Sequence, residues 1–312
     1  MISKEMLWCE KYRPTKVEDC ILPDRLKTPF LDCVKDREIP NLLLHGSSGV
    51  GKTTIAIAMC EEIGLDYMVI NGSDESGIDV FRGKIKNYAS SMSLTGGRKV
   101  IIIDEADYLN ATSTQPALRN AMEDFSSNCT FIFTCNYPAK IIPALHSRCA
   151  TIQFNLQAQE KVSMAGLFFK SVTGILKNEN IPFDKEVIAE VVKRFFPDFR
   201  RTINQLQWYS RFGKIDSGIL SQVNNSSIEE VVKYVKDKDF KSMRKWVATN
   251  DIDVVSIFRQ LYDCFGETMM PASIPQAVII LADYQYKQAF VADSEINLVA
   301  CLTELMGSCE FN

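Results

Sequence analysis

The stretch Gly46-Ser47-Ser48-Gly49-Val50-Gly51-Lys52-Thr53 decides how this chain can fold. One apolar run, residues 41–44, precedes it and another, residues 55–60, follows it, which predicts a strand, a glycine-rich loop and a helix in that order. Such a loop lets backbone N–H groups converge on phosphate oxygens, and the helix N-terminus adds a favourable dipole. The pattern therefore predicts a P-loop in which Lys52 reaches the β- and γ-phosphates of a nucleoside triphosphate and the Thr53 hydroxyl binds Mg²⁺. The alternative, a glycine-rich turn without a ligand, is disfavoured because every fixed position of the motif is filled.

Composition sets the broad class of the protein. The 312 residues carry a formal net charge of −4, with 46% hydrophobic and 24% charged residues, which is ordinary for a globular protein of two or three domains. A uniformly basic surface is excluded, although a local basic stripe could still contact nucleic acid. The ten cysteines include no C-x-x-C pair and predict buried thiols in a reducing compartment. No apolar run is long enough to span a membrane, so we expect a cytoplasmic protein without a membrane partner.

The alternation of elements predicts the fold class. Runs at residues 67–71, 100–103 and 130–134 read as strands, with helices between them up to Phe154. The continuous β-branched run 100–103 is typical of a strand that is buried on both faces of a parallel sheet. From about residue 157 onward the pattern is helical only. The segment 7–14 is expected to be extended, because Pro14 disfavours helix before it. We therefore expect a doubly wound α/β domain followed by helical domains.

Polar residues follow two of these strands. Asp104-Glu105-Ala106-Asp107 ends one strand, where Asp104 would hold Mg²⁺ through water and Glu105 would orient or deprotonate an attacking water. Solvated carboxylates at a strand end are the alternative. Asn136 ends the next strand and could hydrogen-bond the γ-phosphate or the water, or be a turn residue. In Ser147-Arg148-Cys149, the arginine would form a surface ion pair or act as a finger on a neighbour's nucleotide.

Taken in order, these motifs resemble those of clamp-loader AAA+ ATPases. The resemblance is carried by residues 8–14, 46–53, 104–107, 134–136 and 147–149. Residues 70–74, 124–129 and 196–200 carry a more specific resemblance to the ATPase subunit of T4-type bacteriophage clamp loaders. Replication factor C small subunits are related to this family. The resemblance weakens after about Asn224. The family implies an α/β AAA+ P-loop domain with helices on both faces of a parallel sheet (1–156), an all-α lid (157–225) and an all-α collar that mediates oligomerisation (226–312).

The resemblance also implies roles that spacing does not. Asn136 would be the sensor-1 residue, Arg148 an arginine finger acting in trans, and Arg200 the sensor-2 arginine of the lid. The catalytic set would be Lys52, Glu105, Asn136 and Arg148. The predicted nucleotide-binding residues are Tyr12, Arg13, Ile21, Gly46, Ser48, Gly49, Val50, Gly51, Lys52, Thr53, Thr54, Asp104 and Arg200, with Thr53 and Asp104 at the metal.

Three further surfaces follow from the same analogy. The helix that begins near Gly77 would turn its N-terminus and Arg82 toward a DNA backbone, or Arg82 would be a solvated side chain. Tyr88, Met92 and Leu94 would contact the sliding clamp, with a core role as the alternative for Tyr88. Gln115 and Arg119, together with Glu123, would couple DNA contact to the ATP site, or they would be ordinary solvent-facing residues.

The sequence thus predicts the ATPase subunit of a DNA polymerase sliding-clamp loader, with ATP and Mg²⁺ as ligands. Expected partners are other copies of the chain, a companion non-ATPase subunit, the sliding clamp, primer–template DNA and, indirectly, the polymerase. A helicase-type motor, suggested by the letters Asp-Glu-Ala-Asp, would need a second α/β motor domain. A non-hydrolysing ring subunit would typically lack Lys52, Glu105 or the arginine finger, and all three are present here. A monomer should bind ATP but hydrolyse it poorly, because half of the site would come from a neighbour.

Overall fold

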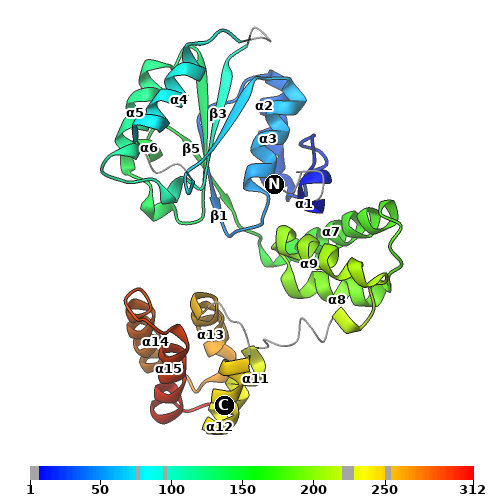
Figure 1. Ribbon diagram of the computed structural model, residues 1–312, viewed down its shortest axis with the longest axis vertical. Coiled ribbons are helices and arrows are strands. Elements are labelled where there is room, and N and C mark those ends of the chain that lie inside the picture. Colours follow the sequence, from blue (N-terminus) through cyan, green and yellow to red (C-terminus); the bar gives the residue numbers. More distant parts are fainter. Residues whose placement is uncertain (1–6, 75–77, 94–96, 220–227, 250–253) are drawn as a thin grey trace. The chain divides into compact units, whose positions relative to one another are not determined.

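The computed structural model describes residues 7–74, 78–93, 97–219, 228–249 and 254–312. The chain divides into two compact units, residues 1–217 and 218–312, and each is described by itself (Figure 1). Within the described residues, no helix is both long and apolar enough to cross a membrane.

A five-stranded parallel sheet forms the centre of the first unit. Its strands are β1 (Leu42–Gly46), β2 (Tyr67–Asn71), β3 (Lys99–Asp104), β4 (Cys129–Cys135) and β5 (Ala150–Phe154), in the order β2-β3-β4-β1-β5. Leu42 of β1 lies opposite Ile132 of β4 and Ala150 of β5. Because all strands run the same way, the carboxyl ends of β1, β3 and β4 meet at one edge, where ligands of open α/β sheets bind.

Helices cover both faces of this sheet (Figure 1). They are α2 (Asp24–Asp36), α3 (Lys52–Ile63), α4 (Ile78–Ser90), α5 (Thr114–Asp124) and α6 (Pro143–His146), with the short 3₁₀ helices η2 (Ala106–Tyr108) and η3 (Pro138–Lys140). Side chains alternate along β1: Leu42 and Leu44 enter the core shared with α3, whereas Leu43 enters the core shared with α5. Because both faces of the sheet are buried under helices, the central strands are unbroken hydrophobic runs. The predicted fold class is confirmed.

The expectation of an extended N-terminal segment is wrong. Residues Trp8–Lys11 form a one-turn helix, α1. Pro14 restricts only the residue directly before it, Arg13, which is indeed not helical. The turn is held by tertiary contacts that the sequence pattern does not reveal: the Trp8 side chain is buried, and the Trp8 N–H donates to Gln207 Oε1 at 3.0 Å.

The rest of the first unit is a helical subdomain made of α7 (Ala158–Asn178), α8 (Lys185–Phe195), α9 (Phe199–Tyr209) and the 3₁₀ turn η4 (Ser210–Phe212). A capping box begins α7, in which the Gln157 N–H donates to Glu160 Oε2 at 2.8 Å. Asp198 caps α9 by accepting from the Arg201 N–H at 2.9 Å.

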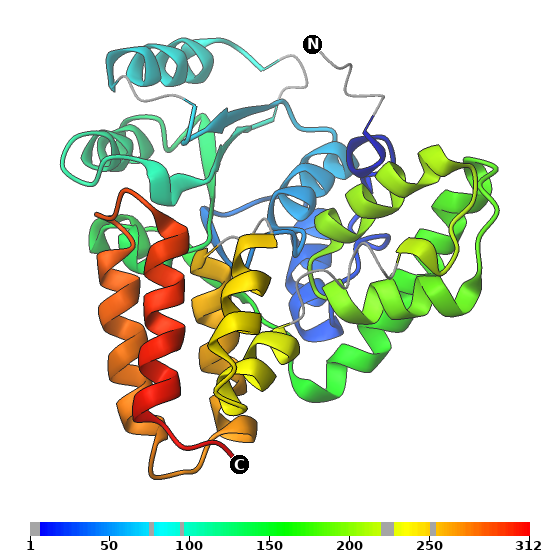
Figure 2. The ribbon, with the colours of Figure 1, turned by 60° about the horizontal axis from the view of Figure 1, so that its bottom comes forward.

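The second unit is a helical bundle built from α11 (Ile228–Lys236), α12 (Phe240–Thr249), α13 (Val254–Thr268), α14 (Ile274–Lys287) and α15 (Ser294–Ser308). Figure 2 shows α14 and α15 side by side. The α15 stripe Leu298, Leu302, Leu305 and Met306 is buried in its core. The domain boundaries at residues 156 and 225 stay predictions.

Candidate functional site

The P-loop connects β1, which ends at Gly46, to α3, which begins at Lys52. Two of its glycines have left-handed backbones, with φ of +75° at Gly49 and +94° at Gly51. A Cβ on Gly51 would meet nothing within 4 Å, so this side of the loop is open. A Cβ on Gly49 would lie 1.9 Å from Asp198 Oδ1, because the N-terminus of α9 packs against the loop. The loop therefore needs glycine for its backbone shape at both positions and, at Gly49, also for the close approach of α9.

Lys52 is the buried cation of the site, with 8% of its surface exposed. Its Nζ donates to Gly46 O at 2.9 Å, to Ser47 O at 2.7 Å and to Asn136 Oδ1 at 2.9 Å. Burial lowers the pKa of Lys52, while nearby acidic groups act in the opposite direction. The ammonium group thus lies between the P-loop and the end of β4, where it can donate to a phosphate oxygen in place of one of these three acceptors.

Asp104 and Thr53 meet at the same edge of the sheet. Thr53 Oγ1 donates to Asp104 Oδ1 at 2.6 Å, and the Thr134 hydroxyl donates to the same oxygen. Thr134 Oγ1 also accepts from the Glu105 N–H at 3.2 Å, which helps to hold Glu105 in its left-handed conformation, φ +54°. A hydroxyl and a carboxylate are the oxygen ligands that Mg²⁺ prefers. Sequence reasoning gave Thr134 no task, although a hydroxyl side chain at the carboxyl end of a predicted strand is a usable signal.

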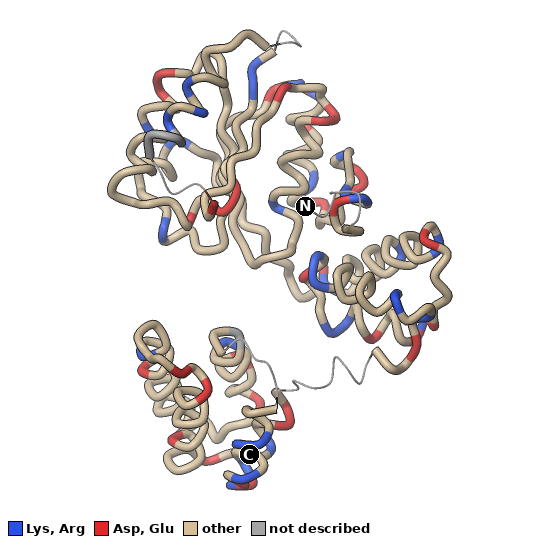
Figure 3. Tube along the Cα trace, in the orientation of Figure 1, with Lys and Arg blue, Asp and Glu red and all other residues tan. Residues whose placement is uncertain are grey.

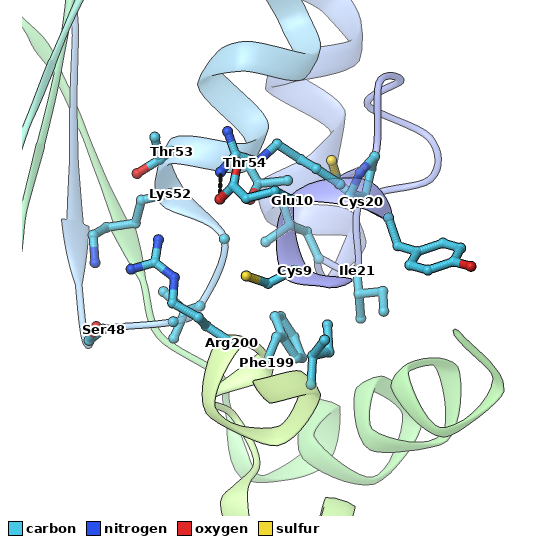
Figure 4. Close-up of a pocket in the computed structure, with 18 of the residues that line it drawn as sticks. Cys9, Glu10, Cys20, Ile21, Ser48, Lys52, Thr53, Thr54, Phe199 and Arg200 are labelled. Atoms are coloured by element: carbon cyan, nitrogen blue, oxygen red, sulfur yellow. Dashed lines mark hydrogen bonds and ion pairs between the residues drawn. The ribbon is translucent and has the colours of Figure 1, made fainter. Parts of the chain in front are cut away.

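The pocket above these residues has a volume of about 140 Å³ and is lined by three segments. They are the P-loop with the strand ends, the N-terminal segment that includes Tyr12, Arg13 and Ile21, and the helical subdomain. In Figure 4 the Arg200 side chain extends from α9 toward Lys52, with Phe199 and Cys9 beside it. The Phe199 N–H donates to Gly49 O at 3.1 Å, so the backbone of α9 touches the P-loop directly.

The N-terminal segment is tied to α7 through Glu179. Lys11 Nζ lies 2.7 Å and Tyr12 Oη 2.6 Å from Glu179 Oε1. Burial and the neighbouring carboxylate raise the pKa of Tyr12, and the two hydrogen bonds lower the pKa of Glu179. Sequence reasoning did not find the other lining residues, because nothing in their spacing marks them: Cys9, Glu10, Asp19, Phe168, Ser171, Ile175, Phe199 and Ile203.

Arg148 is not one of the described residues that line this pocket. Its guanidinium pairs with Glu123 at the end of α5, with Nε 3.1 Å from Glu123 Oε1, and Nη1 donates to Ala144 O at 2.9 Å. The pair is largely exposed to solvent, so Arg148 can exchange this partner for another anion at little cost.

The predicted DNA and clamp residues lie on and after α4. Figure 3 shows Lys and Arg along this helix, where the sequence has Arg82, Lys84 and Lys86. Tyr88 packs partly into the core, with Lys99 Nζ 4.8 Å from its ring centroid. Met92 is 93% exposed. Gly77 and Leu94 lie outside the described residues.

Gln115 is wholly buried, so the solvent-facing alternative is wrong for this residue. Its Nε2 donates to Leu109 O and to Lys140 O, both at 3.0 Å, and its Oε1 accepts from the Ile142 N–H at 2.8 Å. Gln115 therefore joins the segment after the acidic box to the loop between β4 and α6. Arg119 is exposed and donates to Asn120 Oδ1.

Comparison with known proteins identifies the family. The model of the ATPase family associated with various cellular activities (AAA) matches residues 42–156, and that of the sliding-clamp-loader large-subunit AAA+ ATPase lid matches residues 160–221. The chain is 38% identical to the sliding-clamp-loader large subunit of Escherichia phage RB69 over 314 residues, covering 99% of this chain and 97% of that protein. The chain belongs to the sliding-clamp-loader AAA+ ATPases.

Other relatives agree with this membership. The large subunit of Enterobacteria phage T4 is also 38% identical, over 99% of this chain and 97% of its own length. A replication factor C small subunit from Methanocella arvoryzae is 32% identical over 89% of each chain. Among solved structures, the Thermotoga maritima RuvB Holliday junction branch migration motor shares the fold, with a TM-score of 0.57 at 17% identity over 80% of this chain and 85% of that one. This clamp-loader subunit is accordingly an enzyme that hydrolyses ATP.

Proposed function

We propose that this clamp-loader subunit binds ATP and Mg²⁺ in the pocket between the P-loop, the N-terminal segment and the lid. One observation carries the proposal: two hydrogen-bonded pairs, Lys52 with Asn136 and Thr53 with Asp104, line the same pocket as Arg200 of the lid. Groups from the start of α3, the carboxyl ends of β3 and β4, and α9 thus converge on one place, which is what a triphosphate with its metal ion requires.

Within this pocket each residue has a distinct task. Thr53 and Asp104 would hold Mg²⁺, which would neutralise phosphate charge. Lys52 pairs with the β- and γ-phosphates, and Arg200 brings the lid to the γ-phosphate. Glu105 takes a proton from the attacking water, and Asn136 orients that water or the γ-phosphate. Tyr12, Arg13 and Ile21 hold the base and ribose.

Arg148 completes the site of a neighbouring copy in this proposal. Its absence from the lining of its own described pocket, its exposure and its exchangeable partner Glu123 all support action in trans. ATP binding would assemble the subunits, with a companion non-ATPase subunit, into a ring that opens a sliding clamp. Primer–template DNA, contacted by Arg82 on α4, would then align Arg148 with the neighbour's γ-phosphate. Hydrolysis would close and release the clamp for the polymerase in the cytoplasm, that of the host if the chain is phage-encoded.

The clamp contact is proposed at the end of α4, where Met92 is exposed. Tyr88 would support this surface from the core side. Gln115 is the proposed coupling residue, because its three hydrogen bonds connect the acidic-box segment to the loop that leads to Arg148. Arg119 would contribute on the exposed face of the same helix.

Two substitutions test the mechanism in the assembled loader with primed DNA and clamp. Lys52→Ala should abolish ATP binding and hydrolysis. Arg148→Ala should leave ATP binding by the isolated subunit intact and lower stimulated hydrolysis by roughly 10³-fold, the size of an arginine-finger effect. Unchanged stimulated hydrolysis in either variant would refute the mechanism. A helicase is disfavoured, because the described residues beyond 157 form helices and no second parallel sheet.

A further inference from the structure

Asp107, the last residue of the acidic box, has no task in the mechanism above. It lies in η2 and is almost fully buried, with 5% of its surface exposed. Its Oδ2 accepts from the Asn136 N–H at 3.3 Å and from the Tyr137 N–H at 3.1 Å. Its Oδ1 is also buried and has no hydrogen-bond partner among the described residues. Burying a carboxylate costs free energy unless its charge is compensated. We therefore ask what Asp107 contributes by accepting from two backbone N–H groups beside the nucleotide pocket.

The reason lies in how β4 ends. The β4 ladder with β3 reaches Phe133, and that with β1 reaches Cys135, opposite His45. Among the described residues, the ladder pairing of β4 does not extend beyond this point, and the next two N–H groups donate to a side chain instead. Asp107 supplies that acceptor from the segment that follows β3. It therefore continues the ladder by one side chain, and the charge of a carboxylate makes such bonds stronger than neutral ones.

The N–H groups of Asn136 and Tyr137 lie on either side of the Asn136 side chain, which contacts Lys52. Asn136 Oδ1 accepts from Lys52 Nζ at 2.9 Å, and Lys52 in turn donates to the P-loop carbonyls of Gly46 and Ser47. A hydrogen-bonded path thus runs from Asp107 through the backbone of Asn136 to its amide and on to the P-loop. The far end of the same loop, at Lys140 and Ile142, is held by Gln115.

We propose that Asp107 is a positioning residue for ATP hydrolysis, acting through Asn136. It holds the backbone of Asn136 so that the amide faces the γ-phosphate side of the pocket. Since Asp107 accepts from both N–H groups at this end of the loop, losing it displaces the Asn136 amide without removing it. A displacement of about 1 Å can cost roughly 10²-fold in rate, while nucleotide affinity depends mainly on the P-loop. The inference rests on the task proposed for Asn136.

The test is a double-mutant cycle in the assembled loader with primed DNA and clamp, with ATP affinity measured separately. Asp107→Ala should lower kcat roughly 10- to 100-fold and change the Kd for ATP by less than about threefold. Asn136→Ala should also lower kcat, and the double variant should be within about twofold of Asn136→Ala alone, because the first residue acts through the second. Asp107→Asn keeps a neutral acceptor and should lie between wild type and Asp107→Ala.

The matched control is Asn41→Ala. Asn41 Oδ1 accepts from the Phe131 N–H at 2.8 Å, so it makes the same kind of side-chain-to-backbone bond at the opposite end of β4. This variant should leave kcat within about twofold of wild type. A loss equal to that of Asp107→Ala would mean that any weakening of β4 slows hydrolysis, and would overturn the inference.

The other outcomes are equally decisive. If Asp107→Ala lowers kcat as much in the Asn136→Ala background as in wild type, Asp107 does not act through Asn136. If Asn136→Ala is fully active, the task proposed for Asn136 fails first; if only Asp107→Ala is fully active, the present inference alone fails. Should the Asp107 variants not fold, hydrogen exchange in the unsubstituted chain decides: the Asn136 and Tyr137 amides should be protected, and exchange at the rate of a free loop would refute the proposal.

Discussion

The nucleotide pocket is held together by hydrogen bonds between polar side chains, whereas the helical core of the second unit is held together by apolar packing. At the pocket, Lys52 and Thr53 at the start of α3 donate hydrogen bonds to Asn136 and Asp104, respectively, at the ends of strands. In the second unit, α15 is held by apolar side chains such as Leu298 and Leu302, which are fully buried. Hydrogen bonds depend on identity and direction, whereas hydrophobic packing depends mainly on volume and burial. A substitution at the pocket should therefore change chemistry with little loss of stability, and one in the bundle should do the reverse.

Glu105→Gln should produce the largest effect on chemistry. It removes the proposed base but keeps the size of the side chain, so we expect hydrolysis by the assembled loader to fall by about 10²- to 10⁴-fold. ATP affinity and the midpoint of thermal unfolding should stay at wild-type values. A loss of stability as large as that of a core truncation would contradict the expectation, because it would show that Glu105 also stabilises the fold.

Leu298→Ala tests the opposite half of the comparison. Its side chain is 0% exposed, and truncation at such a site costs about 2–5 kcal/mol of unfolding free energy. Ile296→Ala, on the exposed side of the same helix, is the control and should cost under roughly 0.5 kcal/mol. ATP affinity of the isolated subunit should be unchanged in both variants. Denaturant unfolding and ATP titration measure the two quantities, and a loss of ATP affinity in Leu298→Ala alone would show that the bundle contributes to the pocket.

Asp198→Ala addresses the junction between lid and P-loop. Removing the side chain that caps α9 should cost about 1 kcal/mol, because the Arg201 N–H loses its acceptor. Asp184→Ala is the matched control, because Asp184 is the N-cap residue of α8 but its side chain makes no cap hydrogen bond. We expect Asp198→Ala also to weaken ATP binding, since the start of α9 contacts Gly49 and carries Arg200 toward the pocket. Equal effects of the two substitutions on affinity would contradict this link.

The smallest effect is expected at Glu179, as a dependence on pH. Because hydrogen bonds from Lys11 and Tyr12 lower its pKa in the folded state, its contribution is complete above the ordinary carboxyl pKa of about 4.3. It is lost as the pH falls through the lowered value. Glu179→Gln should therefore lower Tm by at most roughly 2 °C at pH 7, because the ion pair is partly exposed. The difference between variant and wild type should vanish in strongly acidic solution, and a difference that persists there would mean that packing, not charge, ties the N-terminal segment to α7.

The contrast between the pocket and the bundle also explains which parts of the structure could be predicted from the sequence. The P-loop and the acidic box were predictable because the chemistry of phosphate and metal binding demands particular residues at short, fixed spacing. Four of the five strands followed from apolar runs, whereas β5, whose side chains are mostly exposed, did not. The N-terminal turn Trp8–Lys11 was not predictable, because contacts about 200 positions away along the chain stabilise it.

The sequence by itself determined the class of fold, the identity of the phosphate-binding loop and the helical character of the second half. Only the tertiary structure decided the partners of the polar residues: Arg148 with Glu123, Gln115 with the loop after β4, and Asp107 with the backbone of Asn136. The physical reason is the range of the interactions. Propensity and periodicity act within a few neighbouring residues, whereas a hydrogen bond between strand ends depends on how strands distant in the sequence are ordered in the sheet.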